Sequence, residues 1–184
     1  MMMFVALEGA DGCGKTTLCA ILADRLKATA YSTPPKKYLQ MRERVDKSAS
    51  PEEHYRFYRD GIYDASEEID AMLKNGQRVV SDRYWLTTYT YHQVMGATVS
   101  WKDFMSIVQP TLTVILALDY ELQVERLLWR GMSAGDRRVL DKQREIAEAF
   151  CQNVLALNIP FIVIDTKLHI PGKCADIVIA ALGS

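Results

Sequence analysis

The sequence predicts an α/β fold in which a five-stranded parallel sheet is flanked by helices. The apolar stretches are short continuous runs, as in strands that are buried on both faces. Segments with helical periodicity lie between these runs, so strands and helices alternate along the chain. Glu8, Asp82, Asp119 and Asp165 stand at the ends of four of the runs. Ligands bind beyond the carboxyl ends of strands in such sheets, so these acids indicate where a site is expected.

The first elements follow this alternation closely. Residues 4–7 form a buried strand, and residues 16–27 carry leucine and isoleucine at helical spacing. A second strand is expected over residues 28–32, where two prolines end it, and a helix is expected over residues 36–45.

The strongest helix start in the sequence is at Ser50. Ser50 is a capping residue, Pro51 suits the first helical position, and two glutamates follow in the first turn. The helix is expected to span residues 51–73 and to stop at an Asn-Gly pair. Gly61 lies inside it, at a cost of up to ~1 kcal/mol relative to alanine.

The second half of the chain supplies three strands and three helices. The strands are expected at residues 78–81, 112–118 and 161–165. The helices are expected at residues 121–129, 138–157 and 174–182, with a Gly-Met-Ser-Ala-Gly segment between the first two. Ser100-Trp-Lys-Asp103 fits a capping box. We find no repeat and no linker, so one domain is expected.

Composition excludes several classes of protein. The chain has 184 residues, of which 49% are apolar and 24% charged, and its formal net charge is -1. A binder of nucleic acid polymers or membrane surfaces would need a basic excess, and no run approaches the ~20 apolar residues of a membrane span. The N-terminus has no signal-peptide pattern, and the four cysteines have no metal-binding spacing. A cytoplasmic protein with free thiols is expected.

Residues 9–16, Gly-Ala-Asp-Gly-Cys-Gly-Lys-Thr, match the phosphate-binding loop G-x-x-x-x-G-K-[ST]. The glycines let backbone N–H groups surround phosphate oxygens, and the helix that follows adds its positive end. Lys15 is expected to bridge the β- and γ-phosphates of a nucleoside triphosphate, and the Thr16 hydroxyl to reach Mg²⁺. The strand before the loop and the helix after it favour a functional loop over a chance match. The residues predicted to bind the nucleotide here are Gly9, Ala10, Asp11, Gly12, Cys13, Gly14, Lys15, Thr16 and Thr17.

Asp82 is the natural second acid of such a site, because it ends the strand at residues 78–81. It is expected to hold Mg²⁺ through water or to take a proton from the acceptor, and capping the next helix is the alternative. The planar fork of Arg83 suits a phosphate group, and a surface ion pair is the alternative there.

With these motifs the chain resembles the thymidylate kinases, a family of P-loop nucleoside monophosphate kinases. Residues 8–17 resemble the first motif of that family and Ser81-Asp-Arg-Tyr84 the second. Thr87-Thr88 and Tyr91 stand where the family has a small hydroxyl pair and an aromatic residue. The resemblance covers almost the whole chain and implies one P-loop kinase domain over residues 1–184. It also implies transfer of a phosphoryl group from ATP·Mg²⁺ to a nucleoside monophosphate such as dTMP, and it allows a homodimer.

The resemblance assigns roles on the acceptor side. Asp11 would hold the 3′-hydroxyl of the acceptor sugar, and Phe57 would stack on the acceptor base. Arg83 would grip the acceptor phosphate, Asp82 would serve the metal, and Tyr91 would line the deoxyribose.

On the donor side it implies that Arg126 lies against adenine. Arg130 and Arg137 would lie in or near a closing lid around residues 130–140 and would meet transition-state charge, because the P-loop has no arginine of its own. A basic helix end that interacts with the helix dipole is the alternative for any one of these arginines. The predicted catalytic residues are Lys15, Asp82, Arg83, Arg130 and Arg137.

The sequence departs from the family near the acceptor base. The family usually carries an arginine four residues after the stacking phenylalanine, and here that residue is Gly61. Arg59 projects about 160° away around the helix and cannot replace it. Losing one charged hydrogen bond costs ~1.5–3 kcal/mol, which is enough to change base preference. On this reasoning Gly61→Arg is expected to improve the use of thymidylate.

A second departure lies near the acceptor phosphate. The arginine-proline segment of the family becomes Ser32-Thr-Pro-Pro35, so Arg42, Lys36 or Lys37 would have to compensate, and Arg42 is the predicted substrate-binding residue. If none compensates, the acceptor lacks a phosphate and the protein is a deoxynucleoside or other small-molecule kinase. A regulatory P-loop NTPase is a third reading, and the absence of an Asn-Lys-x-Asp motif counts against a GTPase. The three histidines show no metal spacing and are expected to be surface or structural.

Overall fold

The apolar runs assemble into one parallel sheet. The computed structural model describes residues 2–183. The strand order is β2-β3-β1-β4-β5, and every neighbouring pair is parallel. The strands are β1 (Phe4–Glu8), β2 (Thr29–Ser32), β3 (Val79–Asp82), β4 (Leu112–Ala117) and β5 (Phe161–Asp165). The predicted α/β fold with a five-stranded parallel sheet is therefore confirmed, and the strands end along one edge.

Helices cover both faces of the sheet. They are α1 (Lys15–Leu26), α2 (Leu39–Ser48), α3 (Pro51–Lys74), α4 (Trp85–Val94), α5 (Tyr120–Arg130), α6 (Ala134–Arg138), α7 (Gln143–Leu157) and α8 (Pro171–Leu182). Short 3₁₀ helices span Lys36–Tyr38, Trp101–Phe104 and Leu140–Lys142. None of the helices in residues 2–183 is long and apolar enough to cross a membrane.

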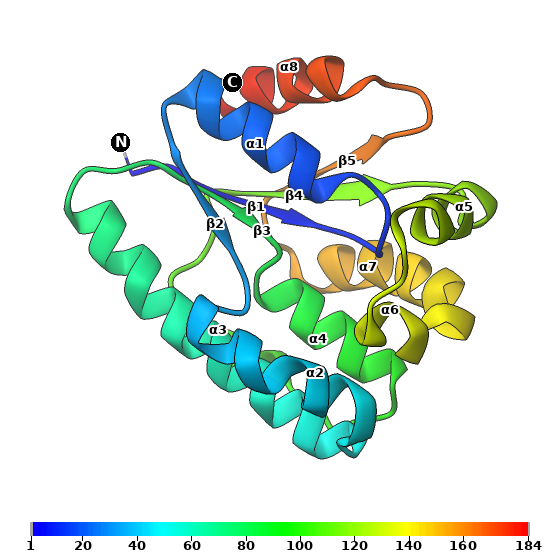
Figure 1. Ribbon diagram of the computed structural model, residues 1–184. Coiled ribbons are helices and arrows are strands. Elements are labelled where there is room, and N and C mark those ends of the chain that lie inside the picture. Colours follow the sequence, from blue (N-terminus) through cyan, green and yellow to red (C-terminus); the bar gives the residue numbers. More distant parts are fainter. Residues whose placement is uncertain (1, 184) are drawn as a thin grey trace.

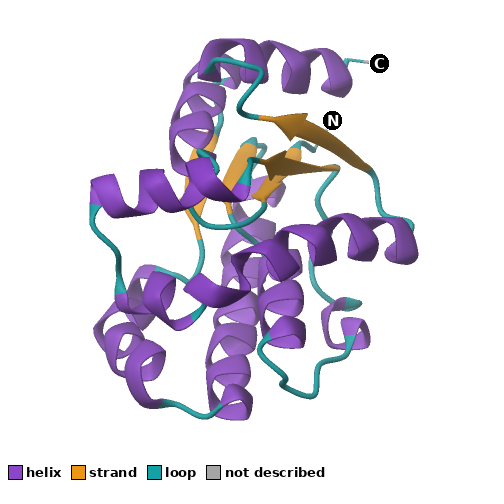
Figure 2. Ribbon diagram, turned by 90° about the vertical axis from the view of Figure 1, so that its right-hand side faces the viewer, coloured by secondary structure: helices purple, strands orange, loops and turns teal. Residues whose placement is uncertain are grey.

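The layers follow from alternation along β1. Val5 and Leu7 pack in the core beneath α1 and α8, whereas Phe4 and Ala6 pack in a second core with α3, α4 and α7. Figure 1 shows α1 and α8 above the sheet and α3, α4 and α7 below it, and Figure 2 shows the same layers from the side. This arrangement leaves the carboxyl ends of β1 and β3 open toward α2, α5 and α6.

The start of α3 forms as predicted. The Ser50 hydroxyl accepts a hydrogen bond from the Glu53 backbone N–H at 3.3 Å, and the Glu53 carboxylate accepts one from the Ser50 N–H at 2.9 Å. This capping box fixes where the long helix begins.

Two predictions about elements were wrong, and one helix was missed. The helix expected over residues 138–157 is divided, because Ser133 caps the short helix α6 in a capping box with Asp136 and a 3₁₀ turn precedes α7. The expected capping box at Ser100 is only half formed, because its hydroxyl accepts from Lys102 N–H while Asp103 accepts from Tyr55. The helix α4 was not predicted at all. Its sequence is rich in aromatic and β-branched residues of low helix propensity, and packing against α3 and α7 overrides that preference.

Candidate active site

The loop between β1 and α1 has the backbone of a phosphate-binding loop. Gly9 has a φ of +131°, and a Cβ there would lie 2.5 Å from the Leu116 carbonyl oxygen, so only glycine fits. Gly14 has a φ of +96° and caps the N-terminus of α1. The buried Lys15 donates to the carbonyl oxygens of Gly9 and Ala10 at 3.0 and 2.6 Å. The ammonium group therefore lies inside the loop.

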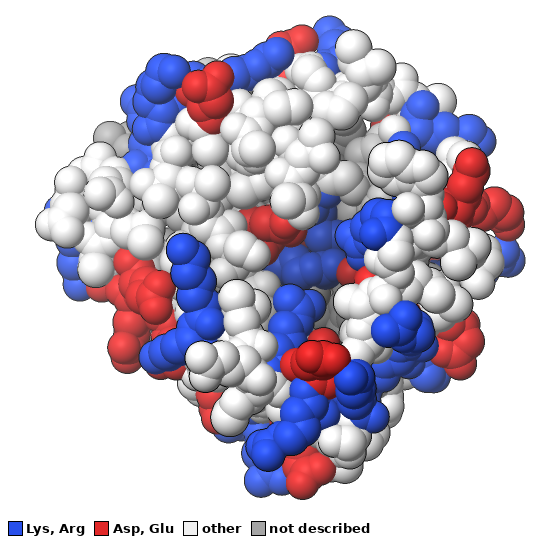
Figure 3. All heavy atoms as spheres, viewed as in Figure 1, with Lys and Arg blue, Asp and Glu red and all other residues white. Residues whose placement is uncertain are grey.

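A large cleft opens in front of this loop. Its volume is about 880 Å³, within the range of small-molecule sites. Loop residues Asp11 to Thr17 line one wall, and Arg126, Trp129 and Arg130 line another. Arg126 donates to the Gly12 carbonyl at 3.4 Å, and Arg130 to Asp136 at 2.8 Å. Figure 3 shows basic side chains gathered around a hollow in this face, so the cleft is suited to an anionic ligand.

Thr16 and Asp82 meet at the mouth of the cleft. The Thr16 hydroxyl donates to Asp82 Oδ2 at 2.5 Å, which joins the start of α1 to the end of β3. One carboxylate and one hydroxyl suit Mg²⁺, which usually takes one or two protein oxygens together with phosphate oxygens of the substrate. Within residues 2–183 no cluster of three or more His, Cys, Asp or Glu side chains could hold a metal without such help.

Asp11 and Arg83 form a half-buried ion pair beside the loop. Arg83 has a φ of 69°, an uncommon conformation for an arginine, which turns the chain as β3 ends. Asp11 also accepts from the Tyr91 hydroxyl at 2.8 Å and from Gln143 at 3.1 Å. Burial opposes the charge on Asp11, but Arg83, Lys15 and these hydrogen bonds together lower its pKa to about 2. The carboxylate is therefore ionised and firmly held.

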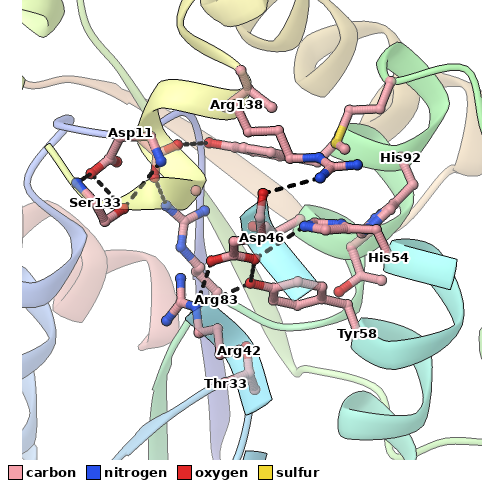
Figure 4. Close-up of a pocket in the computed structure, with 17 residues that line it drawn as sticks. Asp11, Thr33, Arg42, Asp46, His54, Tyr58, Arg83, His92, Ser133 and Arg138 are labelled. Carbon is pink, nitrogen blue, oxygen red and sulfur yellow. Dashed lines mark hydrogen bonds and ion pairs between the residues drawn. The ribbon is translucent and has the colours of Figure 1, made fainter. Parts of the chain in front are cut away.

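A second, smaller cavity of about 70 Å³ lies on the other side of this ion pair. It is bounded by α2, α3, α4 and α6, and Figure 4 shows side chains from these helices pointing into it. Asp11, Arg42 and Arg83 line both this pocket and the cleft. Thr33, Ser133 and Asp136 also line both, so the two spaces meet along these six residues.

Two buried histidines form one wall of the pocket. His54 Nδ1 lies 2.7 Å from His92 Nε2, and His54 Nε2 lies 3.1 Å from Asp46 Oδ1. His92 Nδ1 lies 2.6 Å from the Thr88 carbonyl oxygen. The Tyr58 hydroxyl donates to Asp46 and in turn accepts from Arg42 Nε at 3.0 Å. These side chains form one continuous network (Figure 4).

The structure brings most of the predicted catalytic and binding side chains together, and Phe57 and Arg137 are the exceptions. Phe57 is half-buried and packs edge-on against Tyr38, with ring centroids 5.2 Å apart, while its neighbour Tyr58 lines the pocket. Arg137 is exposed on α6 and lines neither space, whereas Arg138 lines the pocket and donates to the carbonyls of Asp46 and Ala49.

Gly61 lies in close packing and does not line the pocket. A Cβ at this position would lie 3.1 Å from Pro34 Cβ and 3.7 Å from the Tyr38 ring. An arginine there would meet Pro34 and Tyr38 before it reached an acceptor. This packing opposes the expectation that Gly61→Arg would restore a base contact, and the KM of that variant for dTMP decides it.

Sequence reasoning missed the histidine network. His54 and His92 are both buried. His54 contacts Asp46 directly, and His92 contacts His54. A signal was present, because His54 and Tyr58, and likewise Thr88 and His92, are four residues apart on one helix face. The contact between the two pairs depends on how α3 packs on α4, which the sequence does not reveal.

Comparisons with known proteins agree with this geometry. The sequence profile described as thymidylate kinase matches residues 7–174. A probable thymidylate kinase of Archaeoglobus fulgidus is 31% identical, covering 82% of each chain, and one of Methanococcus maripaludis is 32% identical, covering 90% of this chain and 87% of its own. One of Pyrobaculum aerophilum is 27% identical over 96% of this chain and 94% of its own.

Among solved structures, a deoxyadenosine kinase from M. mycoides with bound dATP has a similar fold. The TM-score is 0.70 with 19% identity, and the alignment covers 99% of this chain and 100% of that one. At this identity the likeness concerns the fold alone. The match over residues 7–174, together with the archaeal relatives, shows that the chain belongs to the thymidylate kinase family and is a nucleoside monophosphate kinase.

Proposed function

We propose that the protein transfers the γ-phosphoryl group of ATP to the phosphate of a nucleoside monophosphate, with dTMP as the first candidate acceptor. An oxygen of the acceptor phosphate forms the new P–O bond, and the bond from the γ-phosphorus to the β–γ bridging oxygen breaks, so that ADP leaves. The observation that carries the proposal is that Asp11, Arg42 and Arg83 line both the cleft and the pocket. A donor in one space and an acceptor in the other would meet at these side chains.

The donor half of the proposal rests on the P-loop and its basic surroundings. The backbone of residues 9–17 would hold the phosphates of ATP, and Lys15 would neutralise charge on the β- and γ-phosphates. Arg126 and the exposed ring of Trp129 line the wall expected to face adenine. Arg130 lines the cleft and would supply charge during transfer. Arg137 would be a lid residue that reaches the cleft only if the lid around residues 130–140 closes.

Mg²⁺ fits this site as a partner of ATP. Thr16 and Asp82 would hold it, and when bound it would neutralise charge on the phosphates. The chain's own residues then supply positioning and fixed positive charge, which is the main requirement of phosphoryl transfer.

On the acceptor side, Arg42 and Arg83 are the candidate phosphate ligands, and Asp11 with Tyr91 would meet the sugar. Tyr58 has a better position than Phe57 to stack on a base, because its ring faces the pocket. A deoxynucleoside acceptor is the second candidate function. It is favoured by Thr33, which lines the pocket in the segment where the family has an arginine.

We also propose that the protein acts in the cytoplasm, since all four cysteines are free thiols and three of them are buried. A homodimer is proposed from the family alone.

The experiment is an ADP-release assay with ATP, Mg²⁺ and a panel of nucleoside monophosphates and the matching nucleosides. We expect release of ADP that depends on a monophosphate and is fastest with dTMP, and Lys15→Ala should remove it. Turnover of nucleosides but not monophosphates would select the second candidate. No acceptor-dependent release from any compound would overturn the proposal.

A further inference from the structure

The acceptor pocket contains a hydrogen-bonded chain whose buried acid and histidines have no role in the transfer described above. It runs from Arg42 through Tyr58, Asp46, His54 and His92 to the Thr88 carbonyl. Asp46, His54 and His92 are all buried, and they come from α2, α3 and α4. Buried polar chains of this kind are costly unless every member is satisfied, so the number of protons in this one is constrained.

Counting hydrogens along the chain fixes where they lie. The Thr88 carbonyl can only accept, so His92 Nδ1 carries a hydrogen. If His92 is neutral, its Nε2 accepts, and the 2.7 Å contact requires a hydrogen on His54 Nδ1. The 3.1 Å contact to the Asp46 carboxylate requires another on His54 Nε2. His54 is then an imidazolium ion that donates in both directions.

The electrostatic surroundings agree with this assignment. Burial, reinforced by a charge on His54, lowers the pKa of His92 to about 3, which keeps His92 neutral. Burial opposes the charge on Asp46, but hydrogen bonds from His54 and Tyr58 and the charge of Arg42 lower its pKa. The one extra proton of the chain therefore lies on His54.

Asp46 has two possible cationic partners. Its Oδ1 faces His54 at 3.1 Å, and its Oδ2 lies 3.5 Å from Arg42 Nε. Within the described chain, the polar contacts of Arg42 run through Nε, to Tyr58 and to Asp46. The Nη groups of Arg42 therefore remain for a ligand at the junction of the two spaces.

We propose that protonated His54 neutralises Asp46 and thereby keeps the charge of Arg42 available for the acceptor phosphate. His54 and Asp46 are positioning residues in this account, and the inference rests on the proposed monophosphate kinase function. When the hydrogen-bonded chain loses its proton, Arg42 is the one cation among residues 2–183 that pairs with the Asp46 carboxylate, and the local charge that attracts the phosphate falls by one.

Other titratable or charged side chains surround His54 from each neighbouring element. They are Asp46 and Arg42 on α2, Tyr58 on α3 and His92 on α4. On α6, Arg138 holds the Asp46 and Ala49 carbonyls, and Asp136 is occupied by Arg130 and Ser133. Among the residues described, Asp46 is the acid that contacts the histidine pair.

The experiment compares the KM for dTMP and kcat at several values between about pH 5 and pH 8. In the wild-type protein we expect KM to rise with pH while kcat changes less. His54→Asn should raise KM roughly tenfold at low pH, because Asp46 then pairs with Arg42. Asp46→Asn should flatten the pH dependence of KM, and the double variant Asp46→Asn/His54→Asn should return KM toward the wild-type value.

Glu43→Gln is the matched control, because it also removes one acid from α2. Glu43 pairs with the exposed Lys47 and not with Arg42 or His54. The control variant should leave the pH dependence of KM unchanged. An equally high KM in His54→Asn and in the double variant, or a KM that does not respond to pH in the wild type, would overturn the inference. If circular dichroism shows that His54→Asn does not fold, the dependence of KM on pH in the wild type and in Asp46→Asn provides the test. Absence of any monophosphate turnover by the wild type would instead contradict the proposed function.

Discussion

Asp11 and Arg83 lie 72 positions apart in the chain and form a half-buried ion pair where the donor cleft meets the acceptor pocket. Asp11 belongs to the loop after β1, and Arg83 follows β3, the strand that pairs with β1. The parallel register thus brings together the two motifs that the sequence separates. The pair fixes the orientation of Arg83 beside the phosphates that the protein is proposed to bind.

Asp11→Asn should destabilise the protein at neutral pH, because it leaves the half-buried Arg83 without this counter-charge. The expected loss in the free energy of unfolding is ~1.5–3 kcal/mol, measured by urea denaturation at pH 7. Since Arg83 and its neighbours lower the pKa of Asp11 from 3.8 to about 2, the contribution is present above pH 3.8 and is lost as the pH falls toward 2. The difference in the free energy of unfolding between the wild type and Asp11→Asn should therefore become smaller as the pH falls. A difference that stays constant would contradict this account.

Glu8 should make the wild-type protein less stable as the pH rises. Burial raises the pKa of Glu8 from 4.5 to about 7, although hydrogen bonds from Thr87 and the charges of Arg83 and Lys15 offset part of the effect. The folded protein then binds more protons than the unfolded chain between these two values, so stability falls as the pH increases through that window.

Glu8→Gln should lack this fall. Urea denaturation at pH 5 and pH 8 gives the change in the free energy of unfolding between these two values. This change should differ between Glu8→Gln and the wild type by about a few kcal/mol at most. Glu67→Gln, at an exposed position of α3, serves as the control and should behave as the wild type does. Identical responses in Glu8→Gln and the wild type would show that Glu8 ionises normally.

Tyr58 and Phe57 provide a matched pair of aromatic residues. Tyr58→Ala should raise the KM for the acceptor by about tenfold or more, because loss of a ring stacked on a base costs ~1–3 kcal/mol. Phe57→Ala should instead lower the melting temperature through its contact with Tyr38, with a smaller effect on KM. The reverse pattern would restore the stacking role to Phe57.

Gly61→Arg should destabilise the protein without improving the use of thymidylate. The new side chain would have to displace Pro34, which lies 3.1 Å from the position of its Cβ, and overpacking of this kind costs ~1–3 kcal/mol. Glu67→Arg is the control, because it adds the same side chain at an exposed position of the same helix. A lower KM for dTMP in Gly61→Arg would show that the arginine reaches the base after all.

Most of the fold and the donor site could be predicted from the sequence, because short local patterns determine them. Short apolar runs ended by acids predicted the strands, and the glycine spacing of residues 9–16 predicted a loop whose conformation depends on the loop itself. Element ends were predicted where a local cap sets them, as at Ser50. The helix α4 was missed because packing against α3 and α7 stabilises it more than its own residue preferences do.

The acceptor pocket was harder to predict, because its residues meet only in three dimensions. An aromatic residue on α3 was predicted to face the base, but helix rotation decides between Phe57 and Tyr58, and successive residues differ by about 100° around the axis. The spacing within each helix places His54 with Tyr58 and His92 with Thr88, but it does not pair the two histidines, because they lie on different helices. Their contact depends on how α3 and α4 pack.

The central claim is that a phosphoryl group passes from ATP to the phosphate of a nucleoside monophosphate. The most direct test incubates the wild-type protein with ATP labelled at the γ-phosphorus, Mg²⁺ and dTMP, and then separates the products. We predict that the label appears in a thymidine diphosphate as its terminal phosphate, and that Lys15→Ala removes this product. Label found only in inorganic phosphate, with dTMP unchanged, would contradict the account.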